Sequence, residues 1–216
     1  MEVWDIYDQK RQLTGKTINR GEHLEHDEYH LAVHVWIMND LGQFLIQKRS
    51  VNLRRKPGFW AATGGAALTG EKSIHAAKRE LFEELSIEAS DEELKLIKSF
   101  TRVSNHTDVY FLKRNVAIDT LILQEEEVDD VRWLTISEIK YMILNEEFYH
   151  HGQSYMNQIY DYSYRERLKS HLSIKTKRLE LISCDYELVC DLYYSTELNS
   201  RLFGFDINEE TYRKLK

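Results

Sequence analysis

GAALTGEKSIHAAKRELFEELSI, residues 65–87, is the stretch that decides the fold of this chain. A helix is predicted to open near Ser73, which is a good N-cap residue. Four apolar side chains of that helix fall within an arc of about 80° when successive residues turn by roughly 100°. They are Ile74, Ala77, Leu81 and Leu85. This arc predicts one face that packs on a core.

Three carboxylates, Glu80, Glu83 and Glu84, occupy a neighbouring arc of about 100° on the same helix. Like charges spaced three and four residues apart repel by a few tenths of a kcal/mol per exposed pair. Taken alone, such a cluster is typical of a solvated acidic face. A divalent cation would relieve the repulsion, because hard ions such as Mg²⁺ prefer oxygen ligands. The residues around the cluster decide between these interpretations.

The spacing of the surrounding residues resembles the Nudix box, G-x5-E-x7-R-E-U-x-E-E-x-G-U, where U is aliphatic. Gly65, Glu71 and Arg79 take their places in it, and every fixed position matches except that Ser86 replaces the last glycine. Serine there must tolerate a backbone conformation that glycine adopts freely. We therefore identify the chain as resembling the MutT-like Nudix hydrolases over about residues 3–165.

The resemblance implies a metal site and a fold. Glu80, Glu83 and Glu84 would hold Mg²⁺ or Mn²⁺, with the Gly64 carbonyl as a further ligand, while Arg79 pairs with Glu71. The implied fold is an α/β/α sandwich around a mixed sheet, with the box as a loop–helix–loop. The implied enzyme is a pyrophosphohydrolase, acting on acid anhydrides in phosphorus-containing compounds. Its substrate would be a nucleoside diphosphate derivative or another organic diphosphate.

Two roles stay open at this point. The general base is Glu83 or Glu84 in the box, or Glu127 in the acidic run 125–127, whose plainer interpretation is a surface turn. The basic loop after residue 48 suggests Arg49 and Arg54 as ligands of the substrate phosphates, although such a loop also balances an acidic protein.

The flanking sequence predicts the rest of an α/β domain. Apolar alternation predicts strands over residues 31–38 and 43–49, forming a hairpin around turn residues 39–42. Further strands are expected over 94–102, 108–113 and 131–134. Thr135 and Glu138 have capping-box spacing before a helix over 137–145, and a longer helix is expected over 155–172.

Two alternatives to a hydrolase follow from the same resemblance. The N-terminal pattern, with His23 and His30 seven residues apart, is similar to the branch that includes isopentenyl-diphosphate isomerases. Those enzymes carry Cys-Gly-His where this chain reads Gly64-Gly65-Ala66, so hydrolysis is favoured. A Nudix-like sensor that binds a nucleotide sugar without cleaving it is the other alternative, but such domains tend to lose box carboxylates.

The sequence pattern changes near the end of the chain. We place a domain boundary after residue 172, giving a Nudix domain over 1–172 and an extension of unknown role over 173–216. A strand over 178–182 and a helix over 186–194 are similar to the start of a GNAT acetyltransferase, without its acetyl-CoA loop.

Composition sets the remaining expectations. A net charge of −7 argues against a broad nucleic-acid surface. Neither a long apolar run nor a signal-peptide pattern is present, and Cys184 and Cys190 are the two cysteines. We therefore expect a cytoplasmic protein without membrane or nucleic-acid partners. The expected partner is a small diphosphate substrate, and a homodimer is left open.

Overall fold

The computed structural model describes residues 2–170, 173–175 and 180–182 of the 216-residue chain. Two compact units make up the chain, residues 1–153 and 154–216. The boundary predicted after residue 172 and the role of residues 173–216 stay predictions. In the part of the chain that the structure describes, no helix is long and apolar enough to cross a bilayer.

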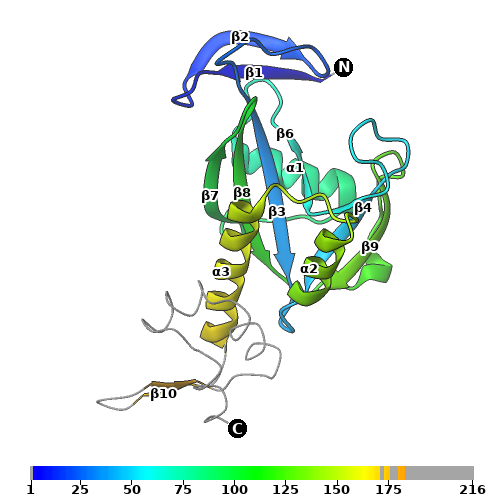
Figure 1. The fold of residues 1–216 in the computed structure, drawn as a ribbon, viewed down its shortest axis with the longest axis vertical. Coiled ribbons are helices and arrows are strands. Elements are labelled where there is room, and N and C mark those ends of the chain that lie inside the picture. Colours follow the sequence, from blue (N-terminus) through cyan, green and yellow to red (C-terminus); the bar gives the residue numbers. More distant parts are fainter. Residues whose placement is uncertain (1, 171–172, 176–179, 183–216) are drawn as a thin grey trace. The chain divides into compact units, whose positions relative to one another are not determined.

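The first unit is built of nine strands, two α-helices and one short 3-10 helix among its described residues (Figure 1). In chain order these are β1 Val3–Tyr7, β2 Leu13–Asn19, β3 His30–Met38, β4 Phe44–Arg49, β5 Trp60–Ala61, β6 Thr63–Ala66, α1 Ser73–Leu85, β7 Lys95–Thr101, β8 Asn105–Lys113, η1 Ile118–Thr120, β9 Val128–Leu134 and α2 Ile136–Leu144.

The described part of the second unit is smaller. Helix α3 spans Gln153–Ser170, within two residues of the predicted bounds at each end. Strands β10 (Ser173–Lys175) and β11 (Glu180–Ile182) then pair antiparallel. The strand predicted over 178–182 is thus present over its last three residues. The helix predicted over 186–194 lies outside the described residues.

Strand β3 lies at the centre of a seven-stranded mixed sheet. It pairs parallel with β8 along nine residues, and antiparallel with β6 and β4. Strand β4 in turn pairs with β5 and β9, and β7 pairs with β8. The predicted β3–β4 hairpin is confirmed, with Ile37 opposite Leu45. A mixed sheet in an α/β sandwich is the fold class that the sequence predicted.

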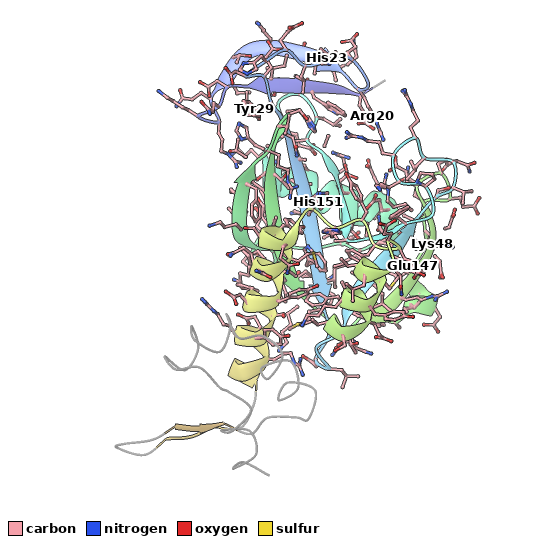
Figure 2. All side chains as sticks on the ribbon, viewed as in Figure 1. Arg20, His23, Tyr29, Lys48, Glu147 and His151 are labelled. Carbon is pink, nitrogen blue, oxygen red and sulfur yellow. The ribbon has the colours of Figure 1, made fainter. Side chains whose placement is uncertain are left out.

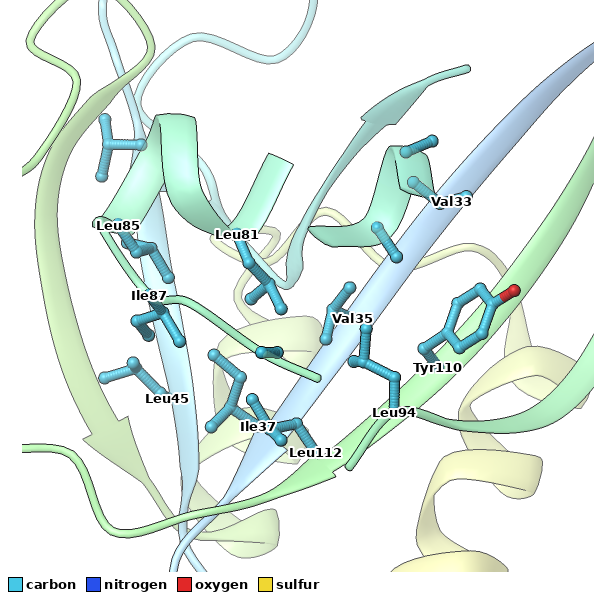
Figure 3. Packing of buried hydrophobic residues seen from close by; sticks show 14 of the residues in the cluster. Val33, Val35, Ile37, Leu45, Leu81, Leu85, Ile87, Leu94, Tyr110 and Leu112 are labelled. Atoms are coloured by element: carbon cyan, nitrogen blue, oxygen red, sulfur yellow. The ribbon is translucent and has the colours of Figure 1, made fainter. Parts of the chain in front are cut away.

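Helix α1 packs its apolar face on β3. Leu81 and Leu85 are fully buried, together with the side chains of Val33, Val35 and Ile37, which alternate along the strand (Figure 3). A strand exposes alternate residues to opposite faces of its sheet, so these three belong to one face. The packing of helix on strand fixes α1, and with it the carboxylates that α1 carries.

The two ends of α1 differ in how well the sequence predicted them. Ser73 is the first residue of α1 and Lys72 is the N-cap, whose side chain has no acceptor to cap the helix. The Ser73 hydroxyl forms a hydrogen bond with the Tyr110 hydroxyl at 2.6 Å. At the other end Ser86 has φ 55° and ψ 31°, the left-handed conformation expected of a residue in the glycine position. Its hydroxyl donates to the Ile122 carbonyl oxygen at 3.0 Å.

The remaining elements agree closely with the sequence. Helix α2 begins after Thr135, and the capping box with Glu138 is present in both directions. Strand β8 begins three residues earlier than predicted, and so does β9. The β1–β2 hairpin was not predicted, because only Ile18 is buried in β2 and no apolar alternation marks that strand.

Candidate active site

The three carboxylates of α1 differ sharply in burial. Glu84 is 2% exposed and Glu80 is 9% exposed, whereas Glu83 is exposed to solvent. The plainer interpretation of the cluster, a solvated acidic face, therefore fails for two of its three members. The physical reason is angular: at roughly 100° per residue, Glu84 stands only about 20° from Ala77 on the core stripe. Helix α1 carries two carboxyl groups into the interior.

Glu84 is held by neutral donors. Its Oε2 accepts from the Gln47 side-chain nitrogen at 3.0 Å and from the Gly64 backbone N–H at 3.2 Å. The Thr63 hydroxyl in turn donates to Gln47 Oε1 at 2.9 Å. Burial raises the pKa of Glu84 well above its usual range, and the charge of Glu80 raises it further.

Glu80 is buried beside a cation. Burial raises its pKa to about 7, although the adjacent Arg79 guanidinium lowers it. The charges of Glu83 and Glu127 act in the same direction as burial. A carboxyl group with this pKa exchanges its proton near neutral pH, where a metal ion can compete for it.

Arg79 ties the glycine loop to the helix. Its Nε and Nη2 donate to the two carboxylate oxygens of Glu71, each at 3.0 Å, and Nη2 also donates to the Ala66 carbonyl. The pairing expected between Arg79 and Glu71 is thus present. Arg79 Nη1 donates to Glu80 at 2.9 Å and to Glu83 at 2.8 Å. Burial would lower the pKa of Arg79, but its three carboxylate partners raise it overall.

The glycine loop passes close to these groups. A Cβ on Gly65 would lie 2.2 Å from Glu80 Oε1, and a Cβ on Gly64 would lie 2.2 Å from the Val33 carbonyl oxygen. Neither position has room for a side chain. At Gly64 glycine is required by the close approach of the loop to the β3 backbone, and at Gly65 a Cβ would displace the Glu80 carboxylate.

Glu127 separates from the rest of its acidic run. Glu125 and Glu126 are exposed, whereas the Glu127 side chain is only 27% exposed. Burial is the main cause of the raised pKa values of Glu80 and Glu84, and the charge of Glu127 raises both further. Its carboxylate lies 3.7 Å from the guanidinium of Arg20. Glu127 therefore lies within electrostatic range of Glu80 and Glu84.

Arg20 is a residue that sequence reasoning missed. It follows β2, inside the N-terminal pattern that is similar to the isomerase branch but without a role assigned to it there, and its Nη1 pairs with Glu2 and Glu127. Burial lowers its pKa, but the charges of Glu2, Glu127 and Glu80 raise it overall. The sequence signal that could have found it is slight, since a lone arginine next to Gly21 has no periodic context.

The two arginines expected to bind phosphate are placed differently. Arg49 donates from Nε and Nη2 to the Arg55 carbonyl at 3.1 and 3.0 Å, so its guanidinium braces the loop after β4. Arg54 is exposed, and its Nη1 lies 3.8 Å from the point where a Cβ of Gly21 would stand. Arg54 thus lies next to the Arg20 segment.

The two histidines with isomerase-like spacing do not resemble each other in environment. His23 is exposed, whereas His30 is partly buried and stacks on Trp4 with ring centroids 4.6 Å apart. Burial lowers the pKa of His30 to about 4. His30 is therefore a neutral aromatic neighbour of the hairpin near pH 7.

The donor set fits a hard divalent cation. Within the described ranges, no three His, Cys, Asp or Glu side chains converge as a ready metal site. The reason lies in Arg79, toward which Glu80 and Glu83 both turn. Yet Glu80 and Glu84 are buried carboxylates with raised pKa values, and Arg79 already serves Glu71 as well. Carboxylate oxygens are the kind of ligand that Mg²⁺ and Mn²⁺ prefer.

A glycine loop clamped by an Arg–Glu pair to a carboxylate-bearing helix, on a mixed-sheet sandwich, defines the Nudix class. The chain matches the NUDIX domain model over residues 28–156. An uncharacterized Nudix hydrolase of Listeria monocytogenes is 38% identical over 162 residues, covering 74% of this chain and 95% of that protein. Nudix hydrolase 3 of Arabidopsis thaliana is 29% identical over 68% of this chain and 21% of that protein. This chain belongs to the Nudix hydrolase family.

A solved structure agrees with this assignment at the level of the fold. The DR0079 protein of Deinococcus radiodurans superposes with a TM-score of 0.61 at 24% identity, covering 74% of this chain and 98% of that one. The family and the fold expected from the box are thereby confirmed. The resemblances to the isomerase branch and to GNAT acetyltransferases stay predictions.

Proposed function

We propose that the protein hydrolyses the diphosphate linkage of a nucleoside diphosphate derivative, or of another organic diphosphate, with Mg²⁺ or Mn²⁺. The observation that carries this proposal is the burial of Glu80 and Glu84 side by side on α1. Two buried carboxylates with raised pKa values lower the stability of a folded chain when ionised. A bound divalent cation would compensate the charges of these two buried carboxylates.

Glu80, Glu83 and Glu84 would hold the metal, together with the Gly64 carbonyl. When bound, the metal supplies charge neutralisation for the diphosphate and a water of lowered pKa. Arg79 keeps the glycine loop against α1, and Gln47 holds Glu84 by its Oε2. These contacts fix the ligands before the substrate arrives, which is what a preorganised site requires.

Glu127 is our choice for the general base that takes the proton of the attacking water. Glu84 is fully enclosed and already accepts two hydrogen bonds on Oε2. Glu127 is more accessible, yet its charge reaches Glu80 and Glu84. A base must reach the water and still be close to the cluster, and Glu127 meets both conditions.

The space around Gly64 favours hydrolysis over isomerisation. The isomerase resemblance would require a cysteine side chain at this position, but a Cβ there would lie 2.2 Å from a backbone oxygen of β3. Backbone atoms of a central strand do not move aside cheaply. The sensor alternative is disfavoured because all three box carboxylates are retained.

The decisive experiment is a substrate screen with the full chain, run with Mg²⁺ and with EDTA. Nucleoside diphosphate sugars, ADP-ribose, NADH, dinucleoside polyphosphates and isopentenyl diphosphate form the panel, and products are identified by chromatography. We expect Mg²⁺-dependent cleavage of a P–O–P linkage. Formation of dimethylallyl diphosphate would support the isomerase instead, and tight binding without turnover would support the sensor.

Variants assign the roles on whichever substrate the screen finds. Glu84→Gln and Glu127→Gln should each lower kcat by about 10²-fold or more, in line with the loss of a metal ligand or a general base. Glu126→Gln is the matched control, because Glu126 is the exposed neighbour of Glu127. If Glu127→Gln keeps the kcat of the control, Glu127 is not the general base, and Glu83 or Glu84 of the box takes that role.

A further inference from the structure

We infer that the N-terminal β1–β2 hairpin completes the active site and that its Arg20 binds a phosphate of the diphosphate substrate. The inference rests on the proposed function and names one more substrate-binding residue for it. Arg20 lies outside residues 28–156, the part matched by the family model. It is therefore a contribution of this chain beyond the matched domain.

The hairpin is fastened to the glycine loop of the box. The Val3 carbonyl accepts from the Thr69 backbone N–H at 2.9 Å and from its hydroxyl at 3.0 Å. Asp5 Oδ2 accepts from the Gly70 N–H at 2.7 Å. Thr69 and Gly70 stand in the loop between Gly65 and the clamp residue Glu71. The hairpin and the metal-binding loop are thus held together as one piece.

A second set of contacts fastens the opposite end of the hairpin to the sheet. Arg11 donates to Asp108 of β8 at 2.7 Å, and the Asp108 side chain is only 6% exposed. The Asp8 carbonyl oxygen lies 2.8 Å from His106 Nε2, and His106 is fully buried. Held at both ends, the hairpin presents the residues after β2 at a fixed place.

Arg20 directly follows β2 and lies near the hairpin (Figure 2). Its Nη1 pairs with Glu2 and lies 3.7 Å from Glu127, a distance longer than a hydrogen bond. The side chain remains 47% exposed. Arg20 is thus positioned by an anchored segment while its guanidinium still reaches solvent beside the cluster.

A second arginine, from the basic loop, lies next to the segment that carries Arg20. The Arg54 Nη1 lies 3.8 Å from the point where a Cβ of Gly21, the residue after Arg20, would stand. The basic loop therefore brings a further positive charge near the end of the hairpin. A diphosphate has the charge to satisfy both sides, because its oxygens bind a metal held by the carboxylates and also accept from arginine.

The chemistry of Arg20 suits an exchange of partners. Its planar guanidinium presents five donors and matches a phosphate with two parallel hydrogen bonds. The Arg20–Glu127 distance of 3.7 Å is longer than a hydrogen bond, so a phosphate can replace Glu127 as a partner of Arg20 without breaking a hydrogen bond between the two. That exchange would also release Glu127 to accept a proton from water.

The test measures binding of methylenediphosphonate, a diphosphate analogue that cannot be hydrolysed, by calorimetry on the full chain with Mg²⁺ present. We expect Arg20→Gln to weaken binding of the analogue about tenfold or more. Arg20→Lys should weaken it less, because lysine keeps the positive charge but lacks the planar guanidinium that donates two parallel hydrogen bonds. Lys16→Gln is the matched control: it removes one positive charge from the same hairpin, at a side chain that is 68% exposed and paired with Glu28. Its affinity should stay within about twofold.

Each outcome bears on the inference separately from the proposed function. An Arg20→Gln protein that binds like wild type overturns the role of Arg20, while hydrolysis by the wild type leaves the proposed function standing. Equal losses in Lys16→Gln and Arg20→Gln would show a general effect of charge and overturn it as well. A wild-type chain that does not bind the analogue contradicts the inference, whereas absence of hydrolysis across the panel contradicts the proposed function.

Discussion

Removal of metal should make the stability of the first unit depend on pH through Glu80. Burial raises the pKa of this carboxyl group to about 7 from an ordinary 4.5. Because the folded-state pKa lies above the unfolded one, the stability contribution is complete below about pH 4.5 and is lost as the pH rises through about 7. At 1.36 kcal/mol per pKa unit, the loss approaches about 3 kcal/mol above pH 8, and most of it falls between pH 5 and 8.

The assay is urea unfolding in EDTA at pH steps from 5 to 8, followed by tryptophan fluorescence. All four tryptophans lie within residues 1–153, so the signal reports on the unit that holds the site. Glu80→Gln is the comparison, because an amide keeps an acceptor for Arg79 but does not ionise. The free energy of unfolding of the wild type should fall relative to Glu80→Gln by about 2 to 3 kcal/mol over this range.

Addition of Mg²⁺ at pH 8 supplies the second half of the test. A cation that binds only the folded chain stabilises it by mass action, and the wild type should gain more than Glu80→Gln. Parallel curves for the two proteins in EDTA would refute the reasoning, since Glu80 would then carry no raised pKa. Equal gains with Mg²⁺ would refute the assignment of Glu80 as a metal ligand.

Two smaller predictions concern residues that the box fixes by shape. Ser86→Ala should lower the free energy of unfolding by about 1 kcal/mol, because the hydroxyl hydrogen bond is lost while the backbone stays left-handed. Ser86→Gly should change the free energy of unfolding by less than about 0.5 kcal/mol, because glycine adopts the left-handed conformation without strain and this gain offsets the lost hydrogen bond. Equal effects of the two variants in thermal melting would contradict this account. Gly65→Ala should weaken Mn²⁺ binding at least tenfold by calorimetry, since the new Cβ would lie 2.2 Å from Glu80 Oε1. Gly70→Ala is the comparison: its Cβ would meet no atom within 4 Å, so the Mn²⁺ affinity should stay intact, although the left-handed φ of 77° lowers the stability of that variant. Equal losses of affinity in the two variants would show that the steric argument is wrong.

The sequence predicted the parts of this structure that depend on local spacing. The packing face of α1 and the left-handed Ser86 follow from intervals of a few residues within the box, while the Arg79–Glu71 pair was implied by the resemblance to the Nudix box. The α2 capping box is likewise a three-residue pattern. Such features are set by helix geometry and backbone sterics, which act whatever lies elsewhere in the chain.

The parts that could not be predicted depend on where distant segments meet. Gln47 is in β4, 37 residues before the Glu84 that it holds, and Arg20 stands 107 residues before Glu127. Strand β2 has no apolar alternation because it is mostly exposed. Helical periodicity also placed Glu84 at the edge of the apolar face without showing that it would be enclosed, because enclosure depends on β6 and its Gly64.

The enclosure of Glu84 explains why the box needs glycine on one side and an arginine clamp on the other. A buried carboxylate is tolerated when its oxygens accept hydrogen bonds, and the Gly64 N–H can reach Glu84 only because the loop carries no side chain there. Arg79 then neutralises Glu80 and Glu83 in the metal-free chain, because its Nη1 contacts both carboxylates. A cation that draws Glu80 and Glu83 from Arg79 would leave the bidentate pair with Glu71 intact. The same arginine can therefore hold the loop in place both before and after the metal binds.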